Sequence, residues 1–429
     1  MIPRYEVKEI SKIWSEEARF EQLLKVERAL LLALEEKGRI PKGTARAFDQ
    51  VKIRPERIHE IEESTRHDVI AFCTSITEQV APTAARYFHF GVTSSDILDT
   101  ALSLQIRDSV ALISNDLKKL CDALLSRARE TQDLLALGRS HGMAAEPMIF
   151  GQKFLSAYTE VKRRLRDYEH VLEHEITGQI SGAVGNYTVL TPEIEASALG
   201  HLKLPVESVT SQVIPRDHLA LIISIGALTA SALERLAVEI RHLHHSDIAE
   251  VHEGFKAGQK GSSTMPHKKN PISSENITGL SRVIRSHVEI ALENIVLWHE
   301  RDISHSSTER MYLPDHFGLV SYAIRRMTQT VTDLEIHRDA IEAKTKRNFT
   351  TLSSLILHEL IDQNTVSREE LYPIVQKAAF QSESLEEMLG TIRADLLVKN
   401  LKGDFSKLTW DGIRTIYITR FQEILRRAT

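Results

Sequence analysis

Residues 219–243 read LALIISIGALTASALERLAVEIRHL, and this stretch decides the fold class. Its later apolar residues recur at intervals of three and four, at Leu233, Leu236, Ile240 and Leu243. That spacing places them on one face of an α-helix, because a helix turns once in about 3.6 residues, whereas a strand requires alternation. The stretch therefore predicts a helix that packs through an apolar face.

The first part of the stretch, Leu219–Leu233, is apolar on nearly every side. Ser224 and Thr229 interrupt it, Gly226 lies inside it, and Glu234 follows directly after it. A helix that spans a bilayer needs about 20 predominantly apolar residues, so this run is too short and too mixed. We expect a helix buried on nearly all sides in a protein core, without a membrane partner.

Proline is rare, with 12 in 429 residues. Because proline is disfavoured inside helices, long spans without it permit long helices. Such spans are 83–146, 148–191, 216–265, 272–313 and 315–372. Apolar residues keep the helical period in them, for example Leu112, Leu117, Leu120, Leu124, Leu134 and Leu135. The best strand candidate, Leu202–Ile214, contains Pro205, so the sequence predicts an all-α protein built on a long helical bundle.

Composition narrows the classes of partner and compartment. Hydrophobic residues make up 42%, charged residues 26%, and the net charge is -5, which provides no general attraction to nucleic acid. Cys73 and Cys121 are the two cysteines and lie far apart, so we expect a reducing compartment, the cytoplasm. The N-terminal MIPRYEVKEI has no apolar core, so we do not expect a signal peptide.

The segment 258–271, GQKGSSTMPHKKNP, breaks the helical pattern most strongly. Ser262 and Ser263 offer hydroxyl groups, and Pro266 and Pro271 bracket a group of cations and hydrogen-bond donors. Such a loop suits carboxylate or phosphate ligands. The alternative is a solvated Gly/Ser linker between two helices, against which the two prolines argue.

Two other clusters are weaker candidates for sites. The histidines at 242, 244, 245 and 252 could hold a metal, but no HExxH motif or cysteine accompanies them, so we expect a solvated or bundle-facing role and no metal site. Gly178, Gly182 and Gly185 lack the preceding strand of a dinucleotide-binding fingerprint, so we expect a turn at one end of the bundle and no nucleotide cofactor.

The pattern GSSxMPxKxNP at 261–271 resembles the signature loop of the fumarase/aspartase superfamily. Further motifs resemble the adenylosuccinate lyase family within it: Arg4-Tyr5, RHD at 66–68, GVTSSD at 91–96, GRSHG at 138–142, AEP at 145–147 and SSTER at 306–310. The argininosuccinate lyases, the nearest rival, usually carry Gln in place of His267. Departures from the pattern are Ser140 for threonine, Met148 for a small polar residue, and His252 and Gly254 for an acidic residue and a proline.

The resemblance implies a fold and an assembly. A long central bundle, here 94–342, is expected between two smaller helical domains, here 1–93 and 343–429. Four chains are expected to assemble into a homotetramer whose active sites combine residues from different subunits.

The resemblance also implies a reaction, the elimination of fumarate from adenylosuccinate, giving AMP, and from SAICAR, giving AICAR. Ser262 would be the base, His141 the general acid, and His67 would contact the substrate and orient the acid. A serine can act as a base only as an alkoxide stabilised by cations and N–H donors, whereas an imidazole titrates near neutral pH. By themselves, His141 could be a buried or capping histidine and His67 a polar residue at a helix start.

The implied binding set comprises side chains suited to carboxylate or phosphate: Arg4, Tyr5, Arg66, Asp68, Thr93, Ser94, Gln212, Ser263, Lys268, Asn270, Asn276, Arg301, Ser306 and Arg310. Arg301 and Arg310 could instead be exposed helical arginines, and Gln212 a plain loop amide. The substrate is a small molecule, and no cofactor or metal is implied. The alternatives are another lyase of the superfamily, acting on argininosuccinate or a related compound, and a non-catalytic helical scaffold.

Overall fold

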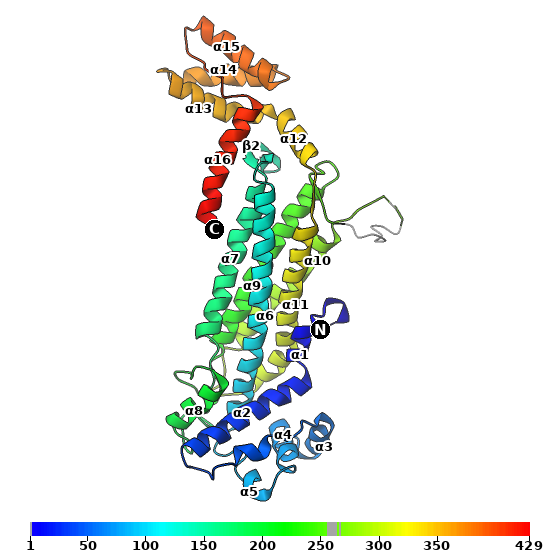
Figure 1. The fold of residues 1–429 in the computed structure, drawn as a ribbon, viewed down its shortest axis with the longest axis vertical. Helices are drawn as coiled ribbons and strands as arrows, with labels where there is room; N and C mark the ends of the chain where they lie inside the picture. Colours follow the sequence, from blue (N-terminus) through cyan, green and yellow to red (C-terminus); the bar gives the residue numbers. More distant parts are fainter. Residues whose placement is uncertain (1, 255–263, 266) are drawn as a thin grey trace. The chain divides into compact units, whose positions relative to one another are not determined.

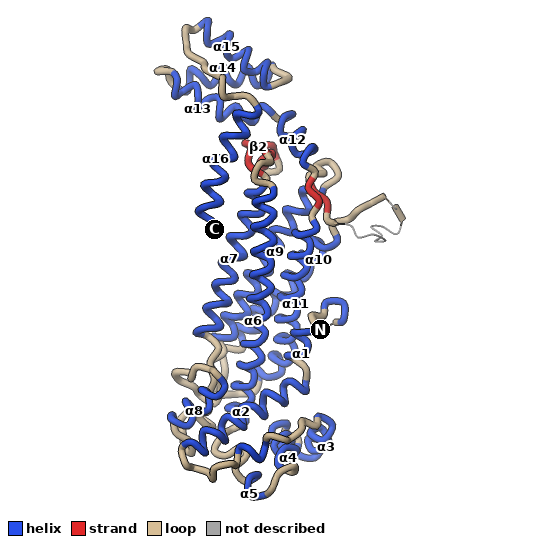
Figure 2. The backbone as a smooth tube through the Cα atoms, viewed as in Figure 1, coloured by secondary structure: helices blue, strands red, loops and turns tan. Residues whose placement is uncertain are grey.

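The computed structural model describes residues 2–254, 264–265 and 267–429, and 68% of the chain is helical (Figures 1 and 2). The all-α class predicted from the apolar period is confirmed. Five long helices carry the bundle: α6 Ser94–Glu130, α7 Gly151–His174, α9 Asp217–His244, α10 Ile272–Glu293 and α11 Ser304–Asp333. Pro314 lies inside α11, so this proline does not end a helix as the sequence suggested.

Shorter elements precede, connect and follow the long helices. The helical ones are η1 Pro3–Tyr5, α1 Lys8–Ile13, α2 Glu16–Glu36, η2 Ala45–Phe48, α3 Pro55–Thr65, α4 Asp68–Thr77, α5 Pro82–Ala85, α8 Pro192–Leu202, α12 Arg338–Arg347, η3 Phe349–Leu352, α13 Ser353–Gln363, α14 Arg368–Gln381, α15 Leu385–Val398 and α16 Trp410–Ala428. The strands are β1 Leu135–Ser140, β2 Met143–Ile149, β3 Val251–His252 and β4 Glu335–Ile336.

The chain divides into two compact units. Unit 1 comprises 1–119, 161–235 and 276–326, and unit 2 comprises 120–160, 236–275 and 327–429. Each unit therefore takes a part of every long helix. The division into 1–93, 94–342 and 343–429 stays a prediction; its first boundary coincides with the start of α6, and its second falls inside α12.

Helix α9 is the apolar stretch that decided the fold class. By length and hydropathy it is the single helix among the described residues that could cross a membrane, yet 61% of its apolar window is buried inside the protein. The expectation of a core helix agrees with this burial, because a helix in a bundle buries its apolar side chains against its neighbours.

Polar contacts fix the packing of the bundle in unit 1. The Ser281 hydroxyl of α10 donates to the Ala230 carbonyl of α9 (3.0 Å), and the Ser321 hydroxyl of α11 donates to buried Asp116 of α6 (2.7 Å). Gly226 of α9 faces α11 so closely that a Cβ there would lie 2.2 Å from Nε2 of buried His316. The absence of a side chain at Gly226 therefore sets the approach of the two helices.

Gly226→Ala should destabilise the protein, although alanine favours a helix by about 1 kcal/mol over glycine. Overpacking a close-packed core costs about 1–3 kcal/mol, and fully buried His316 has little room to move. Gly279→Ala in α10 is the matched control, because nothing lies within 4 Å of its added Cβ. Thermal unfolding should show a lower Tm for Gly226→Ala and an equal or higher Tm for Gly279→Ala. Equal Tm values for the two variants would contradict this account.

The principal strands form a hairpin that the sequence did not predict. β1 pairs with β2 antiparallel, with Leu135 opposite Ile149 and Ser140 opposite Met143. Leu134 and Leu135, which fit the helical period, lie beyond the end of α6, and Leu135 begins β1. The segment Leu202–Ile214, the best strand candidate against which Pro205 argued, has no strand after α8 apart from an isolated bridge at Val206.

Candidate active site

The carboxylate of Asp68, at the start of α4, joins two arginines from distant parts of the sequence. It accepts hydrogen bonds from Nη2 of Arg19 in α2 and Nη2 of Arg310 in α11, both at 3.0 Å. Burial raises the pKa of Asp68, but the two guanidinium charges and the hydrogen bonds outweigh burial and lower it overall. Asp68 therefore stays ionised and orients Arg310, a residue of the predicted binding set.

His67 and Arg66 occupy special backbone positions beside Asp68. Nδ1 of His67 accepts a hydrogen bond from the backbone N–H of Ile70 (3.3 Å), so His67 is the N-cap of α4. When the ring is neutral, the proton therefore lies on Nε2, and 43% of the side chain is exposed. Arg66 has a left-handed backbone, with φ of 52°, where α3 ends. The interpretation of His67 as a residue at a helix start is correct for its backbone role, and its substrate role stays a prediction.

The motif GVTSSD forms the beginning of α6. Thr93 and Ser94 are partly exposed, as a binding role requires. Asp96 is buried and accepts hydrogen bonds from the backbone N–H groups of Thr93 (2.8 Å), Ser181 (3.0 Å) and Gly182 (3.2 Å). Burial raises the pKa of Asp96 to about 6, although these hydrogen bonds lower it. The segment that contains Gly178, Gly182 and Gly185 is therefore a turn held by hydrogen bonds against the beginning of α6.

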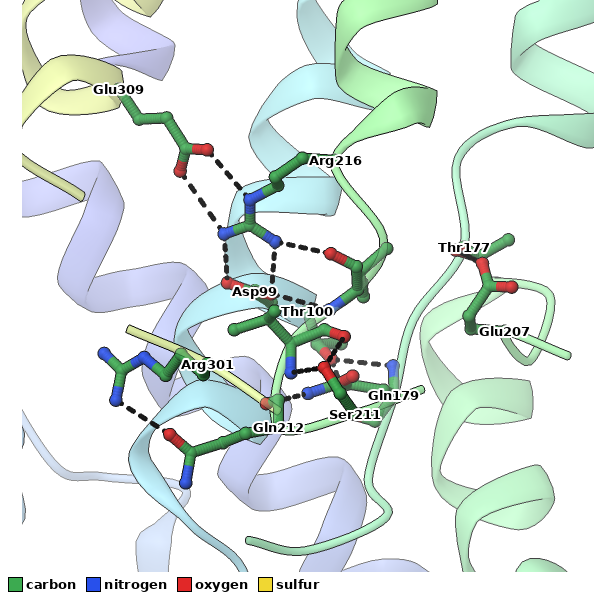
Figure 3. Close-up of polar contacts among 12 residues, drawn as sticks. Asp99, Thr100, Thr177, Gln179, Glu207, Ser211, Gln212, Arg216, Arg301 and Glu309 are labelled. Carbon is green, nitrogen blue, oxygen red and sulfur yellow. Dashed lines mark hydrogen bonds and ion pairs between the residues drawn. The ribbon is translucent and has the colours of Figure 1, made fainter. Parts of the chain in front are cut away.

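Gln212 and Arg301 form another pair of predicted binding residues (Figure 3). Nη1 of Arg301 donates to Oε1 of Gln212 (2.8 Å), and Nε2 of Gln212 donates to the carbonyl of Ala183 (2.9 Å). Gln212 is thus fixed by its neighbours rather than being a free loop amide. The amide oxygen of Asn276 is buried and has no hydrogen-bond partner among the described residues.

A buried charge cluster lies beside this pair (Figure 3). Arg216 donates to Asp99 through Nη1 (2.6 Å) and Nη2 (3.0 Å), and to Glu309 through Nε (2.8 Å) and Nη2 (3.3 Å). All three side chains are less than a tenth exposed. Burial raises the pKa of Glu309 to about 6, against the opposing charge of Arg216. The cluster ties α6, α11 and the residue before α9 together beside the predicted binding residues.

A cavity of about 260 Å³ opens next to the cluster. Four arginines line it, Arg19, Arg216, Arg301 and Arg310, together with Ser306 and the carboxylates of Glu16, Asp99 and Glu309. His305 also lines it, and Nδ1 of His305 is buried without a hydrogen-bond partner among the described residues. Burial and the charge of Arg216 lower the pKa of His305 to about 4, so this ring is neutral at pH 7. The cavity suits an anionic group, because guanidinium groups bind phosphate and carboxylate in pairs of hydrogen bonds.

Arg4 and Tyr5 lie in η1 near the N-terminus, in unit 1. Arg4 is exposed, whereas the ring of Tyr5 packs against Tyr322 of α11, with centroids 5.3 Å apart. Neither residue lines the cavity of the four arginines.

His89, two residues before the GVTSSD motif, pairs with a fully buried glutamate. Nδ1 of His89 lies 2.6 Å from Oε1 of Glu27 in α2, and the backbone N–H of His89 donates to Oε2 of Glu27 (3.1 Å). Burial lowers the pKa of His89, but the hydrogen bond to Glu27 and its charge outweigh burial and raise it overall. The pair therefore joins α2 to the start of the motif.

The His89–Glu27 pair should make stability depend on pH. Folding raises the pKa of His89. The ion pair therefore contributes fully to the free energy of unfolding below about pH 6.5, the ordinary pKa of a histidine. This contribution is lost as the pH rises through the raised pKa. Urea unfolding from about pH 6 to about pH 9 should show Glu27→Gln less stable than wild type by about 1.5–3 kcal/mol at the acid end. The difference should shrink toward the alkaline end, and a constant difference would refute the ion pair.

In unit 2, the β1–β2 hairpin carries His141 at its exposed tip. His141 has φ of 55° and is followed by Gly142 with φ of 78°, so the turn projects the histidine from the hairpin. Arg139 anchors the base of the tip, because its Nη1 donates to buried Glu250 (3.2 Å). His141 is thus neither a capping nor a buried histidine.

The signature loop lies partly within the described residues. Ser262 and Ser263 lie outside them, so their predicted roles are untested. Lys268 and Asn270 line a cavity of about 850 Å³ together with Arg241, Lys269 and five histidines. The side chain of buried Glu253 accepts from the backbone N–H groups of Ser273 (2.9 Å) and Ser274 (2.8 Å), which joins the segments that flank the loop.

The structure thus collects the predicted residues into two groups. Unit 1 brings Asp68 to Arg310 and Gln212 to Arg301, with Ser306 and Arg310 at one cavity. Unit 2 brings Lys268 and Asn270 to a second cavity, which His141 does not line. Sequence reasoning missed the contacts of Arg19, Arg139 and Arg216, because their partners are remote in the chain. It also missed His305, which lies at the start of α11 without a distinctive motif.

Comparison with known proteins identifies the family of this chain. A family described as "Lyase" matches residues 4–286. Adenylosuccinate lyase of Thermotoga maritima is 43% identical over 393 residues, which cover 90% of each chain.

Solved structures share the fold at low identity. Fumarate lyase from Mesorhizobium sp. BNC1 has a TM-score of 0.81 at 22% identity over 93% of this chain and 92% of its own. The 3-carboxy-cis,cis-muconate lactonizing enzyme from Pseudomonas putida has a TM-score of 0.84 at 22% identity. The match covers 99% of this chain and 98% of that enzyme's chain. Since the lyase family matches more than half of the sequence and a relative is 43% identical over 90% of it, this chain belongs to the lyase family of the fumarase/aspartase superfamily.

Proposed function

We propose that this protein is an adenylosuccinate lyase, which eliminates fumarate from adenylosuccinate to give AMP and from SAICAR to give AICAR. The observation that carries the proposal is the 43% identity over 90% of the chain to an adenylosuccinate lyase. The motifs at 66–68, 91–96 and 306–310, and the motif at 138–142 with Ser140 in place of threonine, support the same substrate class. The cavity of four arginines in unit 1 suits the phosphate or carboxylates of a succinyl nucleotide.

The proposed mechanism is a β-elimination. Ser262 takes a proton from the carbon next to a carboxylate, and the electron pair left on that carbon is delocalised into the carboxylate. The C–N bond then breaks, its electron pair goes to nitrogen, and His141 protonates that nitrogen. Lys268, Asn270 and Ser263 hold the carboxylate on which negative charge accumulates.

We also propose a homotetramer with active sites shared between subunits, in the cytoplasm. Exposed apolar side chains on the bundle helices support an interface: Leu221 and Leu228 on α9, Val283 and Leu292 on α10, and Met311 on α11 are 42–76% exposed. Large apolar surfaces on soluble proteins commonly mark contacts between subunits. The exposed His141 fits an acid that meets substrate held by another chain.

A side-by-side assay tests the substrate. Purified protein should release fumarate from adenylosuccinate and SAICAR, and not from argininosuccinate. Turnover of argininosuccinate alone would replace the proposal with another lyase of the superfamily. Absence of turnover with all three substrates, in protein that is folded by circular dichroism, would favour a non-catalytic scaffold.

A further inference from the structure

The short ladder of β3 and β4 places three metal-binding side chains on one face. His252 of β3 lies directly opposite Glu335 of β4, and opposite residues in an antiparallel pair have Cβ atoms about 4.5–5.5 Å apart. His337 follows β4 directly, and residues two apart along a strand point to the same side. The backbone therefore brings two imidazoles and one carboxylate together on one side of the ladder.

The distances between the ligand atoms of these side chains are close to those between ligand atoms that bind one metal ion. One ligand atom from each of His252, Glu335 and His337 lies within 4.8 Å of the others. Nε2 of His337 is 2.9 Å from Nδ1 of His252, and the rings stand at 74°. Two nitrogens bound to one tetrahedral zinc at about 2.0–2.1 Å lie about 3.4 Å apart. A shift of about 0.5 Å would therefore turn the histidine pair into two ligands.

We propose that His252, Glu335 and His337 bind a divalent transition-metal ion, with Zn²⁺ as the preferred ion. Two imidazoles and one carboxylate are a known zinc ligand set, and water fills the fourth position. The elimination of fumarate assigns no role to such an ion, so this site goes beyond the proposed function.

The backbone around the three ligands is already fixed. The backbone N–H of His337 donates to the carbonyl of Glu250 (3.0 Å). A Cβ on Gly254 would lie 2.6 Å from the backbone oxygen of Asp333, so glycine there permits β3 to approach the segment that leads into β4. His252 and Gly254 are the two departures from the family pattern before the loop. The same two departures thus supply a ligand and the close approach that the ligand needs.

The charged neighbours of the three ligands are His244 and Lys269. His244 is not a ligand, because its Nε2 donates to the carbonyl of Lys269 (3.0 Å) and its Nδ1 accepts from the N–H of Glu253 (3.2 Å). The carboxylate of exposed Glu335 supplies the negative charge that offsets Lys269.

Titration calorimetry with Zn²⁺ tests the site on the full chain after treatment with a chelator and its removal. Wild type should bind one ion per chain with a dissociation constant on the order of micromolar or tighter. His252→Ala and His337→Ala should each weaken binding by about 100-fold or more, since each removes a direct ligand. Glu335→Gln, at an exposed position, should weaken it without affecting the fold.

The matched control is the double variant His170→Ala, His174→Ala. These exposed histidines of α7 have ring centroids 4.6 Å apart and could take a metal weakly. The control should bind Zn²⁺ as wild type does, and Zn²⁺ at a concentration that saturates wild type should raise the Tm of wild type and control more than that of Glu335→Gln. Absence of wild-type binding, unchanged affinity in Glu335→Gln, or loss of binding in the control would overturn the proposal. Because no substrate is present, the result is independent of the proposed lyase activity.

Discussion

His141→Ala is expected to lower kcat for adenylosuccinate by a factor of about 10²–10⁴, the usual contribution of a positioned general acid. The side chain of His141 is exposed at the hairpin tip and makes no hydrogen bond to another described residue, whereas Arg139 bonds to Glu250 and anchors the hairpin. The Tm should therefore remain close to that of wild type. The control is His358→Ala, because His358 is also exposed but lies on α13. This variant should keep wild-type kcat. A His141→Ala variant with wild-type kcat would exclude His141 as the acid.

Ser262→Ala should abolish turnover as well, and a mixture of the two inactive variants tests the shared site. If base and acid come from different chains, mixed tetramers contain some sites with both intact groups. Dissociating and reassembling a mixture of Ser262→Ala and His141→Ala should restore part of the activity, whereas either variant treated alone should stay inactive. No recovery in mixed tetramers of proven composition would contradict the sharing of these two residues between subunits.

Arg216→Met should have the largest effect on stability. It leaves Asp99 and Glu309 as two buried carboxylates without their cation, and breaking a buried ion pair costs about 3–5 kcal/mol. Arg338→Met is the matched control, because Arg338 also makes a bidentate pair, with Asp133 at 2.7 Å, but both side chains are exposed. An exposed pair contributes about 0–1 kcal/mol. Urea unfolding of both variants measures the difference.

A triple variant separates lost charge pairing from lost packing. Arg216→Met combined with Asp99→Asn and Glu309→Gln leaves no buried charge, so it should recover part of the stability that Arg216→Met loses. Equal losses for Arg216→Met and Arg338→Met would contradict the structural role of the cluster.

The sequence predicted the long helices well because burial repeats with the helical period. Helix α9 follows directly from the stretch 219–243, and α6 from the leucines up to Leu124. The same criterion failed at Leu134 and Leu135, because a short buried apolar run, such as Leu135–Leu137 at the start of β1, matches either period. The β1–β2 hairpin, and with it the exposed position of His141, therefore required the structure.

The prediction of the site residues was limited in another way. Motifs named Asp68, Gln212 and Arg310, but not the partners that hold them, because Arg19 and Arg216 lie in sequence without a distinctive pattern. The histidine-rich tract illustrates the same limit: His252 lacked a nearby ligand, while Glu335 and His337 lie far along the chain and meet it only across a two-stranded ladder.

The most direct test of the account is a product analysis of a reaction that contains only the purified protein and adenylosuccinate. Chromatography should show fumarate and AMP appearing in equal amounts while adenylosuccinate disappears, without any added cofactor. If folded protein leaves adenylosuccinate unchanged beyond the buffer control, the assignment as an adenylosuccinate lyase is wrong.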